Sequence, residues 1–180
     1  MIRVPRSMTL VVDSRERYPL LFPANIEWHV DRGLGDKKLI RIKHKVAKLD
    51  WGDYLLEGYS ANSAVERKGS LDELHQNLYT DDRERFLKAI RRLRENCRHP
   101  YLLLDVSPLD LWKPTPRAND PAAVWDALID VVSMFGLGLL WGANAKLPGA
   151  RRILGEQVLR ILISHALREE KSWQSEPPPV

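Results

Sequence analysis

Four acidic residues that are far apart in the chain lie at or beside the predicted ends of strands: Asp13, Asp53, Glu66 and Asp72. Alternate residues of a strand point to the same face, so Glu66 and Lys68 should project together, with Arg67 on the opposite face. If Asp53 lies on the neighbouring strand, its carboxylate meets that of Glu66, and the two can hold one divalent cation. Lys68 would then orient or deprotonate a water on that cation for attack on phosphorus. The pattern predicts metal-assisted phosphodiester hydrolysis, although a surface ladder of salt bridges would have the same spacing.

Hydrophobic periodicity predicts the elements that must hold these residues in place. Alternating or β-branched segments predict strands, and residues 52–56 predict a turn that leads into a strand. The unbroken apolar run of residues 101–105 is typical of a central strand that is buried on both faces. The predicted strands cover residues 9–13, 26–30, 39–43, 52–56, 64–68, 101–105 and 137–141.

Apolar residues at helical spacing predict four helices, which follow Ser70, start near residue 82, follow Asp120 and cover about residues 150–170. Ser70 suits the N-cap of the first helix because its hydroxyl can accept a backbone hydrogen bond. Asp120 followed by Pro121 suits the start of the third helix, and Gly136 suits its C-terminal cap. The third helix is predicted to bury a stripe made of Trp125, Leu128, Ile129 and Val132.

The order of these elements predicts the fold class. Strands come first and then alternate with helices around a buried middle strand, which indicates an α/β fold with a mixed β-sheet flanked by helices. The 180 residues are enough for one hydrophobic core, so we expect one domain over residues 1–171. The remaining residues, 172–180, are rich in proline and are expected to form a disordered tail.

The composition narrows the class of protein further. The single cysteine, Cys97, excludes an intramolecular disulfide and a cysteine zinc cluster. No apolar run has the length of a signal peptide or of a membrane span, so we expect no membrane partner and an intracellular location, in the cytoplasm, nucleoid or nucleus. The formal net charge of +4 is compatible with a polyanionic partner without establishing one.

Three segments of the chain carry a resemblance to a known family: residues 12–16, 52–54 and 65–72. Together they closely resemble the nuclease domain of the XPF family of structure-specific endonucleases. The family pattern is Asp-x-Arg-Glu, then Gly-Asp-Tyr/Phe, then Glu-Arg-Lys-x-x-x-Asp, and every fixed position is matched here. The resemblance continues more loosely and covers about residues 9–165.

This resemblance implies a restriction-endonuclease-like fold and cleavage of DNA with Mg²⁺ or Mn²⁺ as cofactor. It implies that Asp13, Asp53 and Glu66 are metal ligands. The implied catalytic set is Asp13, Glu16, Asp53, Glu66, Arg67 and Lys68, with Arg15 and Asp72 as supports. A guanidinium beside a carboxylate cluster can grip a phosphate or fix a ligand's orientation, which agrees with a role for the arginines. Asp72 is equally well explained as a first-turn acid that favours the helix dipole.

Cations are concentrated in the helix predicted from residue 82. They line its exposed face, because its apolar stripe is complete without them. Contacts between such cations and phosphates would give binding that weakens steeply with salt and that discriminates little between sequences. The predicted DNA-binding residues are Arg83, Arg85, Lys88, Arg91, Arg92 and Arg94. A second basic stretch contains Arg41, Lys43, Lys45 and Lys48.

The sequence thus predicts a divalent-metal-dependent DNA endonuclease that acts, as the resemblance implies, at branched, flap or fork structures. Two alternatives stay open. One is a non-catalytic DNA-binding or scaffold subunit of a nuclease complex, although inactive members of the family lose the acids or the lysine that this chain keeps. The other is a nuclease that acts on RNA or from free ends. Because family members often work as dimers, a homodimer or a partner nuclease subunit is also implied.

Overall fold

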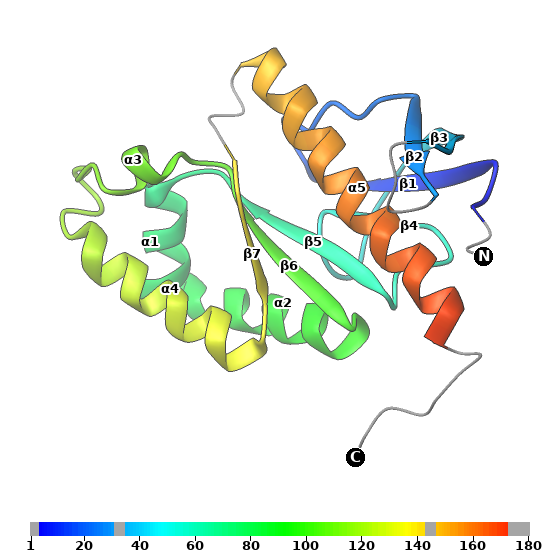
Figure 1. Ribbon diagram of the computed structural model, residues 1–180. Helices are drawn as coiled ribbons and strands as arrows, with labels where there is room; N and C mark the ends of the chain where they lie inside the picture. Colours follow the sequence, from blue (N-terminus) through cyan, green and yellow to red (C-terminus); the bar gives the residue numbers. More distant parts are fainter. Residues whose placement is uncertain (1–3, 31–34, 143–146, 173–180) are drawn as a thin grey trace.

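Seven strands form one mixed sheet in the order β2-β3-β1-β4-β5-β6-β7 in the computed structural model, which describes residues 4–30, 35–142 and 147–172 (Figure 1). The strands are β1 (Ser7–Asp13), β2 (Asn25–His29), β3 (Lys37–Ala47), β4 (Tyr54–Leu56), β5 (Ser63–Lys68), β6 (His99–Leu104) and β7 (Gly138–Trp141). The helices are α1 (Leu71–Tyr79), α2 (Asp82–Asn96), α3 (Pro108–Leu111), α4 (Pro121–Phe135) and α5 (Pro148–Ser172).

The pairing of the strands brings distant acidic residues toward the middle of the sheet. β1 is parallel to β3 and antiparallel to β4, and β4 forms an antiparallel hairpin with β5. The registers place Val12 opposite Tyr54, and Tyr54 opposite Val65. β5, β6 and β7 then run parallel, with Lys68 opposite Leu104. The ends of β1 and β5 therefore lie on either side of the residue that precedes β4, which is Asp53.

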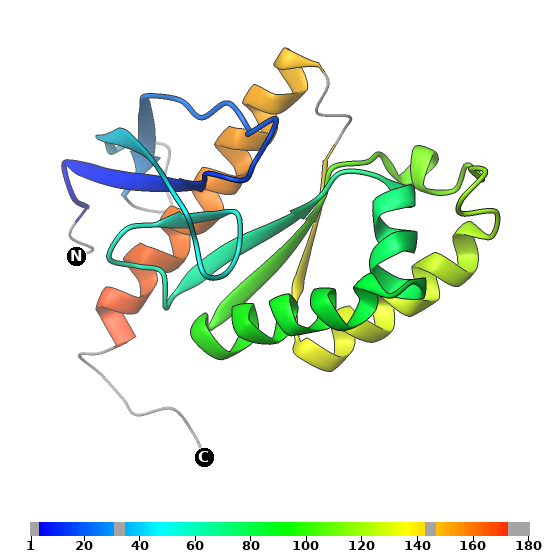
Figure 2. The same ribbon diagram turned by 180° about the vertical axis from the view of Figure 1, so that it is seen from behind.

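Helices cover both faces of this sheet, as Figures 1 and 2 show from opposite sides. On one face, α5 packs through residues such as Val158 and Leu162 against alternate residues of β1 and β3. On the other face, α1, α2 and α4 pack against β6, and Leu93 of α2 also reaches Val11 and Leu55. The predicted α/β class with a helix-flanked mixed sheet is confirmed.

The local signals in the sequence mark the helix ends well. Ser70 Oγ accepts a hydrogen bond from the Glu73 N–H at 3.1 Å, and Asp120 Oδ1 accepts one from the Ala123 N–H at 3.1 Å. Gly136 ends α4 in the left-handed conformation, with φ of 59°, which glycine adopts at little cost. The short α3 was not predicted, because four residues carry no periodic pattern.

The predicted buried stripe of α4 is wrong in its phase. Leu128 is buried as expected, but its buried companions are Val124 and Val131, whereas the other predicted members are half-buried. Trp125, for example, packs against the edge of the core and stacks on Trp141 of β7, with ring centroids 5.5 Å apart. The helix is therefore rotated slightly about its axis relative to the sequence prediction, so that wide aromatic rings lie at the margin of the core.

The predicted disordered tail falls outside the described residues, apart from residue 172, which is the last residue of α5. Within the part of the chain that the structure describes, no helix combines the length and the apolar character that crossing a bilayer requires.

Candidate active site

Asp53 is held at the junction of three strands by its backbone. Its N–H donates to the Val65 carbonyl at 2.7 Å, and its own carbonyl accepts from the Asp13 N–H at 2.9 Å. Gly52 precedes it with φ of +67°, and a Cβ at this position would lie 3.3 Å from the Val65 carbonyl oxygen. Glycine is required at this position by both its backbone conformation and the close approach of β5.

The Asp53 carboxylate lies among other acids. Its Oδ2 accepts a 2.7 Å hydrogen bond from the backbone N–H of Arg67. Burial, followed by the negative charges of Glu66 and Glu16, raises the pKa of Asp53 to about 8. A carboxyl group in such a field favours any added positive charge, because a cation would offset both the repulsion and the lost hydration.

Lys68 and Glu66 project from the same side of β5, as the alternation of the strand predicts. Lys68 Nζ lies 2.9 Å from Glu66 Oε1 and 3.5 Å from Glu73 Oε1, and its side chain is only 12% exposed. Burial alone would lower the pKa of Lys68, but the two glutamates outweigh burial and raise the pKa. The side chain is therefore a fixed, charged ammonium at neutral pH.

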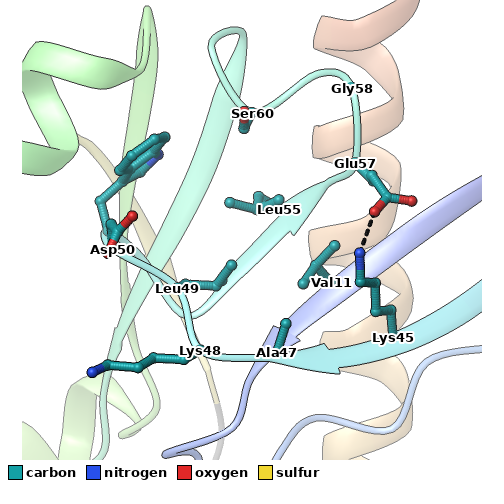
Figure 3. A pocket seen from close by; sticks show the side chains of 11 residues that line it. Val11, Lys45, Ala47, Lys48, Leu49, Asp50, Leu55, Glu57, Gly58 and Ser60 are labelled. Carbon is teal, nitrogen blue, oxygen red and sulfur yellow. Dashed lines mark hydrogen bonds and ion pairs between the residues drawn. The ribbon is translucent and has the colours of Figure 1, made fainter.

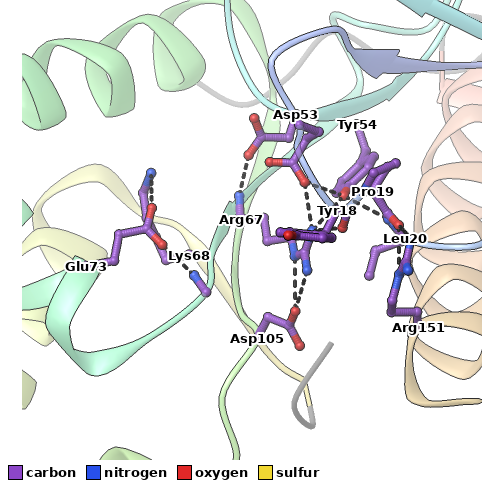
Figure 4. A network of polar contacts seen from close by, with 12 residues as sticks. Tyr18, Pro19, Leu20, Asp53, Tyr54, Arg67, Lys68, Glu73, Asp105 and Arg151 are labelled. Carbon is purple, nitrogen blue, oxygen red and sulfur yellow. Dashed lines mark hydrogen bonds and ion pairs between the residues drawn. The ribbon is translucent and has the colours of Figure 1, made fainter. Parts of the chain in front are cut away.

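Arg67 lies on the opposite side of β5, also as expected, and its guanidinium is enclosed. Nη1 donates to Glu16 and to the Tyr18 carbonyl, each at 2.7 Å, while Nε and Nη2 donate to Asp105. Tyr54 also donates its hydroxyl to Glu16 at 2.9 Å. Figure 4 shows this network on one side of the strand and Lys68 with Glu73 on the other.

Asp13 does not join the other two predicted metal ligands. Its buried carboxylate accepts hydrogen bonds from the Arg15 side chain and from the Arg15 and Leu49 backbone N–H groups. Burial would raise the pKa of Asp13, but these donors together lower it. Within the described residues no group of three or more His, Cys, Asp or Glu side chains is placed to hold a metal. Asp53 lies close to Glu66, because it accepts a hydrogen bond from the residue after Glu66 and its pKa responds to the charge of Glu66, whereas Asp13 pairs with Arg15.

Asp72 faces another part of the molecule. Its Oδ1 accepts a hydrogen bond from the Thr115 hydroxyl, in the segment that leads into α4. This contact ties the first turn of α1 to that segment. Among the described residues no contact joins Asp72 to Asp53 or Glu66, so its supporting role at these carboxylates stays a prediction.

Two acids that the sequence analysis did not select belong to the site. Glu73 pairs with Lys68, and its Oε2 accepts from the Gly69 N–H at 2.7 Å. Asp105 is 2% exposed at its side chain; its Oδ2 binds Arg67, and its buried Oδ1 has no hydrogen-bond partner among the described residues. The available signals were an acid three residues after the helix cap and an acid directly after the apolar run of β6.

The predicted DNA-binding cations all lie on the exposed face of α2. Arg85 pairs with Asp82 at 3.0 Å, which offsets part of its charge. Arg83, Lys88 and Arg91 line an open hollow of about 770 Å³. The structure therefore confirms their exposure, and their contact with DNA stays a prediction.

The structure is thus an α/β domain with a helix-flanked mixed sheet, and it gathers Asp53, Glu66 and Lys68 where β4 and β5 pair. Residues 12–149 match the family model described as the ERCC4 domain, and the chain belongs to this family, that of XPF-type nuclease domains. The family resemblance inferred from the sequence is confirmed.

Solved structures give the same architecture. XPF from Aeropyrum pernix matches with a TM-score of 0.55 and 19% identity over 92% of this chain and 70% of that chain. XPF from Aeropyrum pernix in complex with DNA matches with a TM-score of 0.57 and 21% identity over 86% of this chain and 64% of that one. At these identities the likeness establishes the fold alone. A search of curated proteins found no match.

Proposed function

We propose that this chain is a DNA endonuclease that depends on Mg²⁺ or Mn²⁺ and cleaves branched, flap or fork structures. The observation that carries the proposal is the convergence of Asp53 and Glu66, which are thirteen positions apart in the sequence, beside the buried ammonium of Lys68. Membership of the ERCC4 domain family supports DNA as the substrate. A surface salt-bridge ladder, the alternative explanation of this spacing, does not fit side chains that are almost entirely enclosed.

The residues present fit a hard divalent cation. Mg²⁺ retains several waters and is often held by only one or two protein carboxylates, so Asp53 and Glu66 are a sufficient pair. Within the described residues, the only hydrogen bond to the Asp53 carboxylate comes from the Arg67 N–H to Oδ2. Its other oxygen therefore remains able to serve as a ligand. When bound, the cation supplies Lewis-acid polarisation of the phosphate and a water of lowered pKa.

The remaining residues of the site have roles that follow from their contacts. Lys68 stays charged, so we assign it the donation of a hydrogen bond to a phosphate oxygen and the stabilisation of charge that develops there, rather than the removal of a proton. The Arg67 backbone orients Asp53, and the contacts of its guanidinium with Glu16 and Asp105 hold that backbone in place. Arg67 and Glu16 thus act as positioning residues in this proposal.

The exposed cations of α2 are assigned to the phosphate backbone. They lie on the helix that packs next to β5 and carry few neutralising partners. Phosphate contacts position a nucleic acid without reading its sequence, which suits an enzyme that recognises a structure. A homodimer or a partner subunit remains a prediction, which gel filtration of the purified chain with and without DNA would measure.

Cleavage assays on end-labelled duplex, flap, fork and single-stranded DNA, each with Mg²⁺ or with chelator, test the proposal. We expect internal cuts in flaps or forks that require the metal and are lost in Lys68→Ala. Products released only from free ends would identify an exonuclease, and cleavage of RNA alone would change the substrate. DNA binding without cleavage by wild type would identify a non-catalytic subunit and contradict the proposal.

A further inference from the structure

The outer part of the sheet presents a row of cations on the same face as α2. β3 alternates strictly here: Ile40 and Ile42 are buried beneath α5, whereas Arg41 and Lys43 between and beyond them are exposed. Alternate residues of a strand share a face. Lys45 pairs with Val11 of β1, which contacts the α2 side of the sheet. The exposed cations of β3 and those of α2 therefore lie on one side of the molecule.

Six residues around the start of β1 and the middle of β3 enclose a hollow of about 330 Å³: Arg6, Ser7, Asn25, Leu39, Arg41 and Lys43. We call it the β3 hollow. The Arg41 N–H donates to the carbonyl of Arg6, the residue before β1, at 3.0 Å, which holds the backbones of the two arginines next to each other. The three cations and the polar groups of Ser7 and Asn25 together surround one concave space.

Within the described ranges of the chain, no acid neutralises the charge of the β3 hollow. Lys37 and Lys45, which flank it on the same strand, pair with Glu27 and Glu57 at 3.0 and 2.5 Å. Among the described residues, Arg6, Arg41 and Lys43 form no ion pair with an acid. Three cations gathered in a concave site without acids attract a polyanion, and a guanidinium can bind two phosphate oxygens at once.

The position of the β3 hollow fits a long ligand that passes the carboxylates. Ser7 pairs with Arg41 at one end of β1, and Asp13 ends the strand beside Asp53. Six steps along a strand cover about 20 Å. In a duplex, about 20 Å corresponds to about six base pairs, at about 3.4 Å for each.

The surface between the two sites is also hollowed. A pocket of about 260 Å³ lies between the end of β3 and the β4–β5 turn, and Figure 3 shows Lys45, Lys48 and Val11 among its labelled lining residues. Trp51, two residues before Asp53, is part of the same lining. The pocket thus leads from the basic face of β3 toward the residues that precede β4.

We propose that the β3 hollow is a phosphate-binding subsite that holds the nucleic-acid backbone about six base pairs from the cleaved bond, at about 3.4 Å for each pair. The inference rests on the proposed function for the identity of the ligand as a nucleic acid. The hollow gives the chain a second surface that binds the substrate, in addition to the cations of α2.

The test measures how DNA binding changes with salt, in chelator so that no cleavage occurs, for a fork with arms of at least twelve base pairs. The slope of log K against log salt is negative, and each lost phosphate contact reduces its magnitude by about 0.9. For Arg41→Gln with Lys43→Gln we therefore expect the slope to become shallower by about 1.8. The control is Lys37→Gln with Lys38→Gln, which removes the same charge from the same strand at a paired lysine and at a lysine on the other face.

A salt dependence that becomes shallower only in the Arg41/Lys43 variant supports the subsite. An unchanged slope in that variant, or an equal change in both variants, overturns it. All four side chains are exposed, so unfolding temperatures should match that of wild type. Cleavage with Mg²⁺ is scored separately: wild type that binds with the expected slopes but does not cut contradicts the proposed nuclease activity and leaves the subsite standing.

Discussion

Each side of β5 holds one cation among carboxylates, but the carboxylates on the two sides are partnered differently. On the side of Arg67, the guanidinium meets two carboxylates, Glu16 and Asp105, and a hydroxyl and a carbonyl complete the network. On the side of Lys68, one ammonium faces Glu66 and Glu73, and Asp53 lies close enough for its pKa to rise to about 8. On the Arg67 side each carboxylate pairs directly with the guanidinium, whereas on the Lys68 side a third carboxyl group, that of Asp53, lies among the acids without an ion pair among the described residues.

This difference distinguishes residues that hold the backbone in place from residues that could take part in catalysis. A buried charge that has all its partners is rigid and holds the backbone around it, as Arg67 does for Asp53. A buried carboxyl group that is crowded by other acids is stabilised when it takes up a proton or when a cation binds, which is the property that a ligand of a divalent metal needs. Substitutions on the two sides should therefore have different consequences, activity on one and stability on the other.

The largest expected effect is on the Lys68 side. Glu66→Gln removes one of the two carboxylates, and we expect cleavage to fall by at least about 10²–10³-fold, because charge stabilisation at the reacting phosphate is lost. DNA binding in chelator and the unfolding temperature should stay close to wild type. Glu57→Gln, at an exposed acid paired with Lys45, serves as the control and should cleave normally. If Glu66→Gln loses both cleavage and the folded state, Glu66 has a structural role, and the proposed difference between the two sides of β5 is contradicted.

Next in size is the effect of Asp105→Asn on the Arg67 side. It leaves Arg67 with one carboxylate partner in a buried site, and we expect it to destabilise the fold by about 3 kcal/mol, the low end for breaking a buried pair. Cleavage should fall by about 10–100-fold, since Asp53 loses its fixed orientation. Chemical denaturation and single-turnover rates measure the two effects. Asp110→Asn, at an exposed pair with Lys113, should change neither, and full activity in Asp105→Asn would refute the positioning role.

The third prediction concerns pH and leaves cleavage aside. Because the pKa of Asp53 is raised in the folded state from 3.8 to about 8, the stability present at low pH is lost as pH rises through this window. Asp53→Asn keeps an acceptor for the Arg67 N–H and cannot ionise. Without metal, its unfolding temperature should therefore exceed that of wild type by a margin that grows from pH 4 to pH 8 and then levels off. A margin that does not change with pH would show that burial and the neighbouring acids do not raise the pKa of Asp53 in the folded state.

The sequence predicts the fold well where the signal is local. The caps at Ser70 and Gly136 and the alternation of β5 depend on neighbours in the chain, and the structure confirms them. The stripe of α4 was wrong because a helix can rotate by a fraction of a turn to accommodate wide rings such as Trp125, and periodicity does not resolve so small a rotation.

The site was predicted only in part, because some of its contacts depend on strand register. Asp105 reaches Arg67 because β5 and β6 run parallel with Lys68 opposite Leu104, a pairing that no local pattern encodes. Asp13 was expected beside Asp53, and its backbone is there, but Arg15 folds back two residues later and engages its carboxylate. The motif fixes which residues gather, and the tertiary structure decides which way each one faces.

The most direct measurement of the central claim, that Asp53 and Glu66 together hold a divalent ion, is a calorimetric titration of the metal-free protein with Mn²⁺. We predict one binding event for wild type at neutral pH, and affinity at least about tenfold weaker in both Asp53→Asn and Glu66→Gln. Wild-type affinity in both variants would contradict the claim.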